Sequence, residues 1–261
     1  MSSIAAPELV HTACSQGVFT VTLDRPPVNA LDDALVDALH AAVQAATRDP
    51  DVCVLHLRSA CRVFCAGADL SLMEQSIRTP RGLEQMLALV SRLQELAWCI
   101  EAAPLVTLAE LAGAALGGGF ELALACDLRI AAHEAKLGLP EAGLGLLPAA
   151  GGTQRLTRLA GAGVARRLIL GAETVDGQTA ERLGLVQWSL PRAELDAGAR
   201  AHAERIATLP RAAIVAAKQC IAAAQDSARD GFAEELAQTR RLYQHPVTRS
   251  RVQAFLARSA R

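Results

Sequence analysis

The sequence predicts an α/β fold, or a mixed fold with parallel strand pairings, and two observations carry this prediction. Short β-branched and apolar runs alternate with amphipathic helical stretches up to about residue 132, which is typical of parallel sheets with crossover helices. From about residue 151 onward, nearly every apolar pattern is helical. With 261 residues, 51% of them hydrophobic, the chain is long enough for one substantial domain, with or without a smaller appended segment.

The first predicted strand and helix lie near the N-terminus. Val18–Leu23 (VFTVTL) is rich in β-branched residues and is followed by the breaker Arg25-Pro26-Pro27, so it predicts a strand. Apolar residues then recur at helical spacing behind Asp32 and Asp33. Either aspartate is a suitable helix cap, and we expect the helix to run to about Thr47.

Two further strands enclose a long helix. Val52–Leu57 (VCVLHL) predicts a second strand, and Leu83–Ile100 predicts an amphipathic helix. A third strand is expected to start at Val106–Leu108, after Pro104. A glycine-rich turn, Gly113–Gly119, then opens onto an apolar helical stretch.

The second half is predominantly helical. A short strand is expected at Leu128–Ala132 and another at Leu185–Leu190. The pattern from Arg192 onward indicates a separate helical unit that packs against the core or against another subunit. We therefore divide the chain into a core, residues 1–191, and a C-terminal helical segment, residues 192–261.

Charge and composition limit the classes of partner. The 26 basic and 27 acidic side chains give a net charge of −1, which offers no reason to expect nucleic acid or an anionic membrane. The N-terminal residues lack the basic and apolar regions of a signal peptide, and the apolar runs elsewhere are too short to span a bilayer. These features predict a soluble intracellular protein.

The cysteines and histidines predict neither a disulfide framework nor a metal site. The seven cysteines are an odd number, and the six histidines are scattered without zinc-ligand spacing. Reduced thiols in the cytosol are therefore expected. We interpret Cys65 and Cys126 as small buried hydrophobic residues rather than nucleophiles, because neither has a base partner in the sequence.

The first segment that could carry chemistry is Val63–Leu70 (VFCAGADL). Gly67 permits a sharp turn, and the small side chains at 66–68 let a ligand approach the backbone. Asp69 is placed to cap a helical turn that begins at Leu70. The alternative is an ordinary loop with a glycine for its turn.

The second segment is Gly113–Glu121 (GAALGGGFE). Three consecutive glycines at the start of a helix leave backbone amides uncovered, which is what an oxyanion hole requires. No Lys-Ser/Thr follows, so the pattern is not a phosphate-binding P-loop, and the spacing of a dinucleotide fingerprint is also absent. Glu121 is either a functional acid or a residue that merely complements the helix dipole.

The third segment is Lys136–Pro148 (KLGLPEAGLGLLP). Glu141 is surrounded by apolar and glycine residues, so we expect its carboxyl group to be desolvated and its pKa raised, as proton transfer requires. The alternative is a surface glutamate on a loop.

Taken together, these segments resemble the crotonase superfamily, the enoyl-CoA hydratase/isomerase family. The resemblance runs from Arg25 to about Val186 and is densest in FCAGADL, ALGGGFELALACD, LGLPEAGLGLLP and GGTQRL, which occur in the family's order. It implies the crotonase (ClpP/crotonase-like) fold, in which ββα units repeat along a spiral core and a C-terminal helical segment mediates trimerisation.

The resemblance also assigns binding roles. Two backbone amides, of Ala68 and Gly118, would hold the thioester oxygen of an acyl-CoA and stabilise its enolate. The loop from Ala66 to Leu70 resembles the segment that contacts the adenine of coenzyme A, and Arg25 to Ala30 resembles a second wall of that site. The residues expected to bind substrate are Arg25, Val28, Ala30, Ala66, Gly67, Asp69, Leu70 and Gly117.

The two family glutamates correspond to Glu121 and Glu141. The resemblance implies that Glu121 chiefly activates water and Glu141 chiefly delivers a proton, giving reversible hydration of a trans-2-enoyl-CoA to a 3-hydroxyacyl-CoA. The two carboxyls are coupled and can share protons. The reaction requires no metal, flavin or nicotinamide, and coenzyme A arrives as part of the substrate.

Several positions depart from the family pattern, and these leave acyl-chain preference open. They are Cys61, Pro104, Glu110, Ala112 and Ala149. Glu110 adds an acid to a normally apolar strand end. It is either a third carboxylate near the pocket or an outward-facing strand residue, and we expect the latter.

Two rival functions remain. One is a Δ3–Δ2-enoyl-CoA isomerase, or another acyl-CoA lyase or hydrolase, that uses Glu141 alone. The other is a non-catalytic member that binds coenzyme A or RNA, or acts as a scaffold. The resemblance further implies a homotrimer or a dimer of trimers through Pro191–Arg261, with Phe255 and Arg258 resembling a segment that reaches a neighbour's site.

Overall fold

A six-stranded mixed sheet forms the centre of the protein, in a computed structural model described for residues 8–259. The strand order is β1-β2-β3-β4-β6-β9, and every pairing is parallel except that of β1 with β2. The predicted α/β class is thus confirmed. The strands are β1 (Val10–Ser15), β2 (Val18–Leu23), β3 (Val54–Ser59), β4 (Val106–Leu111), β6 (Leu128–Ala132) and β9 (Trp188–Leu190).

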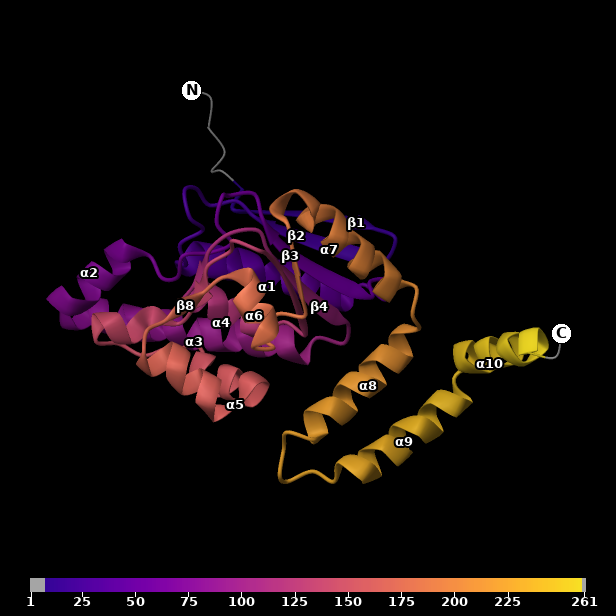
Figure 1. The fold of residues 1–261 in the computed structure, drawn as a ribbon. Coiled ribbons are helices and arrows are strands. Elements are labelled where there is room, and N and C mark those ends of the chain that lie inside the picture. Colours follow the sequence, from indigo (N-terminus) through magenta and orange to yellow (C-terminus); the bar gives the residue numbers. More distant parts are fainter. Residues whose placement is uncertain (1–7, 260–261) are drawn as a thin grey trace.

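Helices cover both faces of this sheet (Figure 1). The helices α1 (Asp33–Arg48) and α3 (Pro80–Ala102) pack against each other, and α7 (Arg192–Ala207) crosses five of the strands. Asp32 caps α1, since its carboxylate accepts the N–H of Leu35 at 2.9 Å. The short helix α2 (Leu70–Arg78) is capped by Asp69, as the sequence predicts, and has no buried residue.

A second, smaller sheet lies beside the main one. It pairs β5 (Ala115–Leu116), β7 (Leu137–Gly138) and β8 (Thr174–Val175). Around it run the short elements α4 (Gly118–Leu124), η1 (a 3₁₀ helix, Pro140–Leu144) and α6 (Gly177–Arg182), and the longer helix α5 (Gly152–Leu170). The glycine-rich turn predicted at residues 113–119 therefore contains one strand of this sheet and the start of α4.

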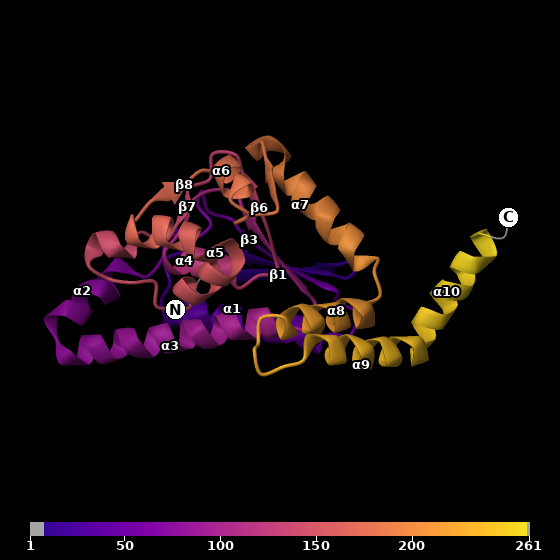
Figure 2. The ribbon, with the colours of Figure 1, turned by 60° about the horizontal axis from the view of Figure 1, so that its bottom comes forward.

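The last three helices extend away from the sheet (Figure 2). They are α8 (Arg211–Ala223), α9 (Gly231–Gln244) and α10 (Pro246–Ser259). Polar contacts fasten α8 to the core: Arg211 donates to the Pro104 carbonyl at 2.9 Å, and Lys218 lies 2.8 Å from Asp127. The helix α7, which lies in the predicted C-terminal segment, packs on the sheet of the core, whereas α9 packs against α8 and α10. The division of the chain between residues 191 and 192 stays a prediction.

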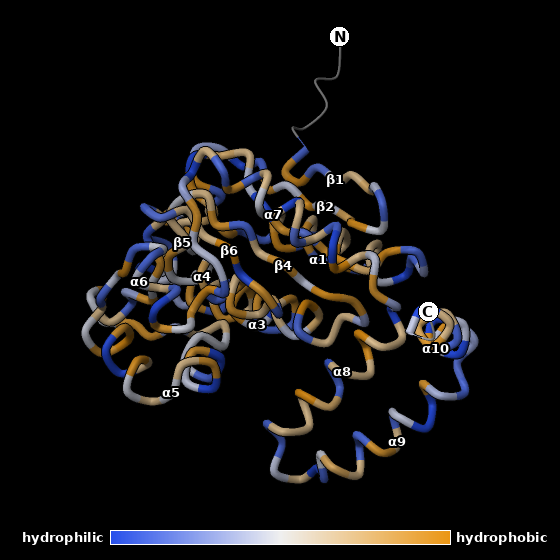
Figure 3. Tube along the Cα trace, turned by 45° about the vertical axis from the view of Figure 1, so that its right-hand side comes forward, coloured by the Kyte–Doolittle hydropathy of each residue, from blue (hydrophilic) through white to orange (hydrophobic). Residues whose placement is uncertain are grey.

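Hydrophobic and hydrophilic residues alternate along α8, α9 and α10 (Figure 3). Several large apolar side chains of these helices are exposed, namely Ile221, Phe232, Leu236, Tyr243, Val252, Phe255 and Leu256. Within residues 8–259 no helix alone is both long and apolar enough to cross a membrane. Only α7 and α8 together meet the length and composition criteria, across a 101° bend.

Some expectations about elements are wrong in detail. The strand predicted at residues 185–190 begins only at Trp188, because the preceding residues form a turn whose Leu185 carbonyl accepts from Arg129. The strand predicted at Val52 begins at Val54. The N-terminal segment in which we expect no signal peptide includes residues 1–7, and these, with residues 260–261, lie outside the described part.

Candidate active site

The loop at residues 63–69 is held in place by the segment that follows β2. The buried Asn29 amide donates to the Phe64 carbonyl at 2.9 Å and to the Ser59 hydroxyl at 2.7 Å. Backbone bonds join Ala66 N to Val28 O at 3.1 Å and Leu31 N to Gly67 O at 2.8 Å. Two predicted binding segments, residues 25–30 and 66–70, are therefore neighbours in the fold.

Arg25 braces this pair of segments. Its guanidinium group donates to the Ala30 carbonyl at 3.0 Å and lies 2.8 Å from both Asp69 and Asp32. These contacts lower the pKa of Asp69, after the larger effect of its hydrogen bond with Ser71. Because the N–H groups of Arg25 already bind groups within the protein, this residue holds the segments 25–30 and 66–70 together.

The two glycine-bearing segments approach each other closely. A Cβ on Gly67 would lie 3.2 Å from the Leu116 carbonyl oxygen and 3.7 Å from Gly118 N. Gly67 also has a φ of 98°, and Gly117 a φ of 53°, in the left-handed region where glycine is favoured. Small residues are needed here for both conformation and space.

Both predicted oxyanion-hole amides lie at this junction. Neither Ala68 N–H nor Gly118 N–H has a hydrogen-bond acceptor among the described residues. The Gly118 amide belongs to the first turn of α4, where no intrahelical acceptor exists. Two free donors thus stand on adjacent segments, as binding of a negatively charged oxygen requires.

Glu121 extends from α4 and is buried, with 3% of its surface exposed. The Gly152 N–H donates to its Oε1 at 2.7 Å. Desolvation raises the pKa of Glu121 to about 7, with a further rise from Glu141, while hydrogen bonds from the Gly152 and Ala150 amides and the charge of Arg155 oppose the shift. A carboxyl that titrates near neutrality is suited to exchange a proton with substrate or water.

Glu141 lies in η1, on the other side of the glycine turn. A Cβ on Gly117 would come within 3.1 Å of its Oε1, which places this carboxyl against the start of α4. Its Oε2 is buried without a hydrogen-bond partner among the described residues, and desolvation raises its pKa. An unpartnered buried carboxyl oxygen is costly, so it indicates a group poised for a ligand.

The structure brings the three predicted segments together. Gly67 contacts the residue 116–118 turn, Gly117 contacts Glu141, and Glu141 raises the pKa of Glu121. Leu70, the first residue of α2, is exposed over 78% of its surface. Cys65 and Cys126 are buried, as predicted. Within residues 8–259, no group of three or more His, Cys, Asp or Glu side chains is arranged to hold a metal ion.

Sequence reasoning missed three residues that support Glu121 and the helix that carries it. Gly152 supplies the amide bound to Glu121, Arg155 holds the neighbouring Ala150 carbonyl at 3.1 Å, and the buried Arg129 binds the Ala123 and Cys126 carbonyls at the end of α4. The motif GGTQRL contains the first two, but nothing in its spacing reveals which acid it would meet.

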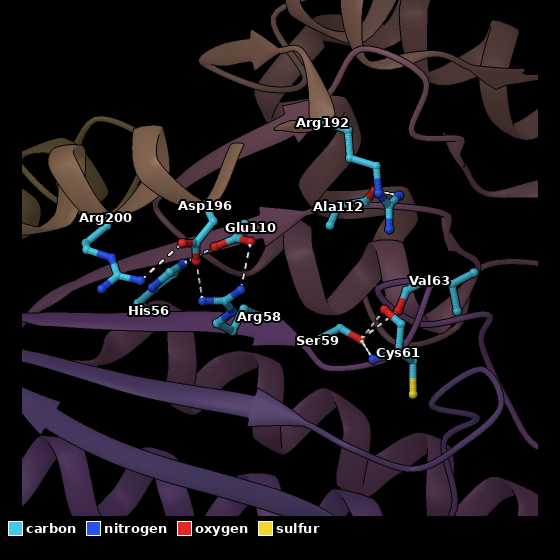
Figure 4. Close-up of polar contacts among 10 residues, drawn as sticks. All are labelled: His56, Arg58, Ser59, Cys61, Val63, Glu110, Ala112, Arg192, Asp196 and Arg200. Atoms are coloured by element: carbon cyan, nitrogen blue, oxygen red, sulfur yellow. Dashed lines mark hydrogen bonds and ion pairs between the residues drawn. The ribbon is translucent and has the colours of Figure 1, made fainter. Parts of the chain in front are cut away.

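Glu110 is not the outward-facing residue that the sequence led us to expect. It is 3% exposed and lies on the face of the sheet that α7 covers, in a cluster with His56, Arg58 and Asp196 (Figure 4). Its carboxylate is 2.9 Å from His56 Nε2 and 3.5 Å from Arg58. The helix α7 covers this face of the sheet, which would otherwise be exposed to solvent, and the guanidinium of Arg58 compensates the buried charge of Glu110.

Comparison with known proteins gives concordant results. A model of the family described as enoyl-CoA hydratase/isomerase matches residues 13–259. The chain is 43% identical over 204 residues to the bovine (Bos taurus) mitochondrial protein named enoyl-CoA hydratase domain-containing protein 2, covering 77% of this chain and 67% of that one. It is 37% identical to a Mycobacterium tuberculosis protein named "Probable enoyl-CoA hydratase echA8", covering 90% of this chain and 88% of that one.

Solved structures show the same fold. The crystal structure of the enoyl-CoA hydratase from Bacillus anthracis is 33% identical, with a TM-score of 0.89 and coverage of 96% of both chains. The match to this structure confirms the predicted crotonase fold. Fold, family model and sequence identity agree, and the chain belongs to the enoyl-CoA hydratase/isomerase family.

Proposed function

We propose that the protein is an enoyl-CoA hydratase that adds water reversibly to a trans-2-enoyl-CoA and forms a 3-hydroxyacyl-CoA. One observation carries this proposal. Two carboxyls with raised pKa values, the buried Glu121 and the partly buried Glu141, lie around a glycine turn that has two free amide donors nearby. Hydration requires a base, an acid and stabilisation of an enolate, and this arrangement offers all three.

In the proposed mechanism, the ionised Glu121 takes a proton from water while the water oxygen bonds to C3 of the enoyl group. The C2–C3 π electrons move toward the thioester, and the developing oxyanion is stabilised by the amides of Ala68 and Gly118. Protonated Glu141 then delivers its proton to C2. The Gly152 N–H orients Glu121 at 2.7 Å. The next turnover requires one proton to return from Glu121 to Glu141.

The coenzyme A portion is proposed to lie along the joined segments. Their residues are Arg25, Val28, Ala30, Ala66, Gly67, Asp69 and Leu70, with Gly117 at the reacting end. The partly exposed Val28 and Ala30 lie beside the exposed Ala66, and Arg25 stiffens this wall through Asp69. No cofactor or metal is proposed, because addition of water to a conjugated double bond exchanges no electrons.

The quaternary structure and compartment are further proposals. The exposed apolar side chains of α8–α10, including Phe255 at 65% exposure, support a homotrimer or a dimer of trimers. A cytosolic compartment remains a prediction from cysteine usage, and some relatives carry "mitochondrial" in their names.

Crotonyl-CoA hydration, followed through the absorbance of the conjugated thioester, tests the proposal in the wild type, Glu121→Gln and Glu141→Gln. Each substitution is expected to lower kcat by a factor of about 10² to 10⁴. Full activity in both variants would refute the assignment. If only Glu141→Gln loses activity and no labelled solvent oxygen enters the product, the isomerase alternative replaces it. A screen of short to long enoyl-CoA substrates would then define chain preference.

A further inference from the structure

The segment Ala149–Gly152, which contacts Glu121, is clamped from its outer side. Gly152 N–H donates to Glu121 Oε1 at 2.7 Å. The carbonyl of the adjacent Ala150 accepts from Arg155 Nη1 at 3.1 Å, and the Ala149 carbonyl accepts from Gln94 at 2.6 Å. The backbone that orients this acid is therefore held by side chains of α3 and α5.

Arg155 is the centre of this clamp. It belongs to the first turns of α5 and folds back over the start of its own helix, where a Cβ on Gly151 would lie 2.1 Å from its Nη1. Glu101 of α3 fixes the guanidinium, with Oε2 at 3.1 Å from Nε and 2.9 Å from Nη2. With 13% of the Arg155 side chain exposed, the group has little freedom to move.

The chemistry of the position suits arginine in particular. A planar guanidinium can donate to a carboxylate and a backbone carbonyl at once, which a lysine ammonium cannot reproduce in the same geometry. The charges that act on Glu121 are Glu141 from η1, which raises its pKa, and Arg155 from α5, which lowers it. Glu101 faces the outer side of Arg155.

We propose that Arg155, locked by Glu101, is a positioning residue that holds the Ala150–Gly152 backbone against Glu121. The proposal extends the function assigned above, because it rests on Glu121 acting in proton transfer. The alternative is that the ion pair between Arg155 and Glu101 only stabilises the fold. Another arginine of the same helix, α5, forms a second arginine–glutamate pair that serves as a control. Arg167 pairs with Glu173 at 2.5 Å, but both side chains are exposed and far less constrained.

The kinetic test compares Arg155→Gln and Arg155→Lys with the control Arg167→Gln. In Arg155→Gln, we expect kcat to fall about 10- to 100-fold while KM changes by less than about twofold, because a displaced acid affects the transition state more than substrate binding. Arg155→Lys should lie between Arg155→Gln and wild type. Arg167→Gln should match the wild type.

The pH dependence separates positioning from stability. Loss of the cation, together with looser amide bonds to the carboxylate, should raise the pKa of Glu121, so the acidic limb of kcat/KM should move to higher pH by at least about 0.5 unit in Arg155→Gln. A lower melting temperature with an unchanged limb and an unchanged kcat would overturn the proposal. If Arg155→Gln does not fold, the Arg155→Lys variant decides, and wild-type kcat in that variant contradicts the proposal.

Infrared spectroscopy supplies a readout that needs no turnover. The carboxyl band lost in Glu121→Gln identifies Glu121, and its titration is compared in wild type, Arg155→Gln and Arg167→Gln. A higher pKa confined to Arg155→Gln supports the proposal, and equal pKa values in all three refute it. Absence of wild-type hydration would count against the proposed function alone, since this comparison would still test the positioning role.

Discussion

Two buried glutamates on opposite sides of the fold have very different surroundings. Each is only 3% exposed. Glu110, under α7, has His56 at 2.9 Å and Arg58 at 3.5 Å. Glu121, beneath the glycine turn, accepts amide hydrogen bonds from Gly152 and Ala150 and makes no ion pair among the described residues. The charge of a buried acid that has an arginine beside it is compensated, whereas a buried acid held by backbone amides with no ion pair has its pKa raised toward neutrality.

The largest expected effect is on activity. Glu121→Gln should lower crotonyl-CoA hydration by a factor of about 10² to 10⁴, because the base is lost. Glu110→Gln, assayed at a temperature where the variant is folded, should retain activity within about threefold, because Glu110 lies on the α7 face. Equal losses in the two variants would remove the functional distinction between the acids.

A smaller loss of activity is expected when a methyl group is added at Gly152, next to the Glu121 carboxyl. In Gly152→Ala the new Cβ would lie 2.8 Å from Glu121 Oε1 and 2.9 Å from its Cγ, so the carboxyl must move. Activity should fall about 10²-fold. Gly163→Ala is the matched control on the same helix, since its Cβ meets nothing within 4 Å. Wild-type rates in Gly152→Ala would show that this contact does not position the acid.

The free energy of unfolding should change in opposite directions at the two sites. Because the folded pKa of Glu121 is raised from 4.5 to about 7, ionising it removes stability as pH rises through this range. Glu121→Gln should therefore gain about 2 to 3 kcal/mol at pH 8 and little below pH 4.5. Glu110→Gln should lose about 2 kcal/mol, because His56 and Arg58 lose their acid while Arg58 keeps Asp196.

Urea unfolding of both variants and the wild type, at pH 4.5 and pH 8, measures this difference in sign. A loss of stability in Glu121→Gln at pH 8 would mean that its carboxylate is compensated in a way the geometry does not show. A gain of stability in Glu110→Gln would mean that the free-energy cost of desolvating the Glu110 charge exceeds the attraction between this charge and its neighbours.

The smallest effect is on the pH profile. We expect the acidic limb of kcat/KM to lie near pH 7 in the wild type and to move by less than about 0.3 unit in Glu110→Gln, since Glu110 is not among the groups that shift the pKa of Glu121. Steady-state kinetics between pH 5 and pH 9 check this. A limb that shifts in Glu110→Gln would show that the two faces are electrostatically coupled.

The same contrast explains what sequence reasoning could and could not foresee. Glu121 and Glu141 could be identified because small and apolar neighbours along the chain imply a crowded, dry setting. The class of fold followed from strand and helix periodicity. The short strands β5, β7 and β8 have only two residues each and carry no periodicity, so they were not foreseen.

The environment of Glu110 could not be predicted, because its partners come from β3 and α7, which only the tertiary structure brings together. The role of Arg155 was likewise hidden. Its partners are a backbone carbonyl five residues earlier and a carboxylate on α3, 54 residues earlier. Long-range contacts of this kind leave no mark in local spacing.

The most direct test of the account is the protonation state of Glu121 in the unliganded wild-type protein. Its carboxyl infrared band, assigned by its loss in Glu121→Gln, is followed from pH 4 to pH 9. The account predicts that this carboxyl loses its proton with a pKa of about 7, because burial without an ion pair disfavours its charged form. A carboxyl that is already ionised at pH 5 would contradict the central claim that burial brings the pKa of this catalytic base close to neutrality.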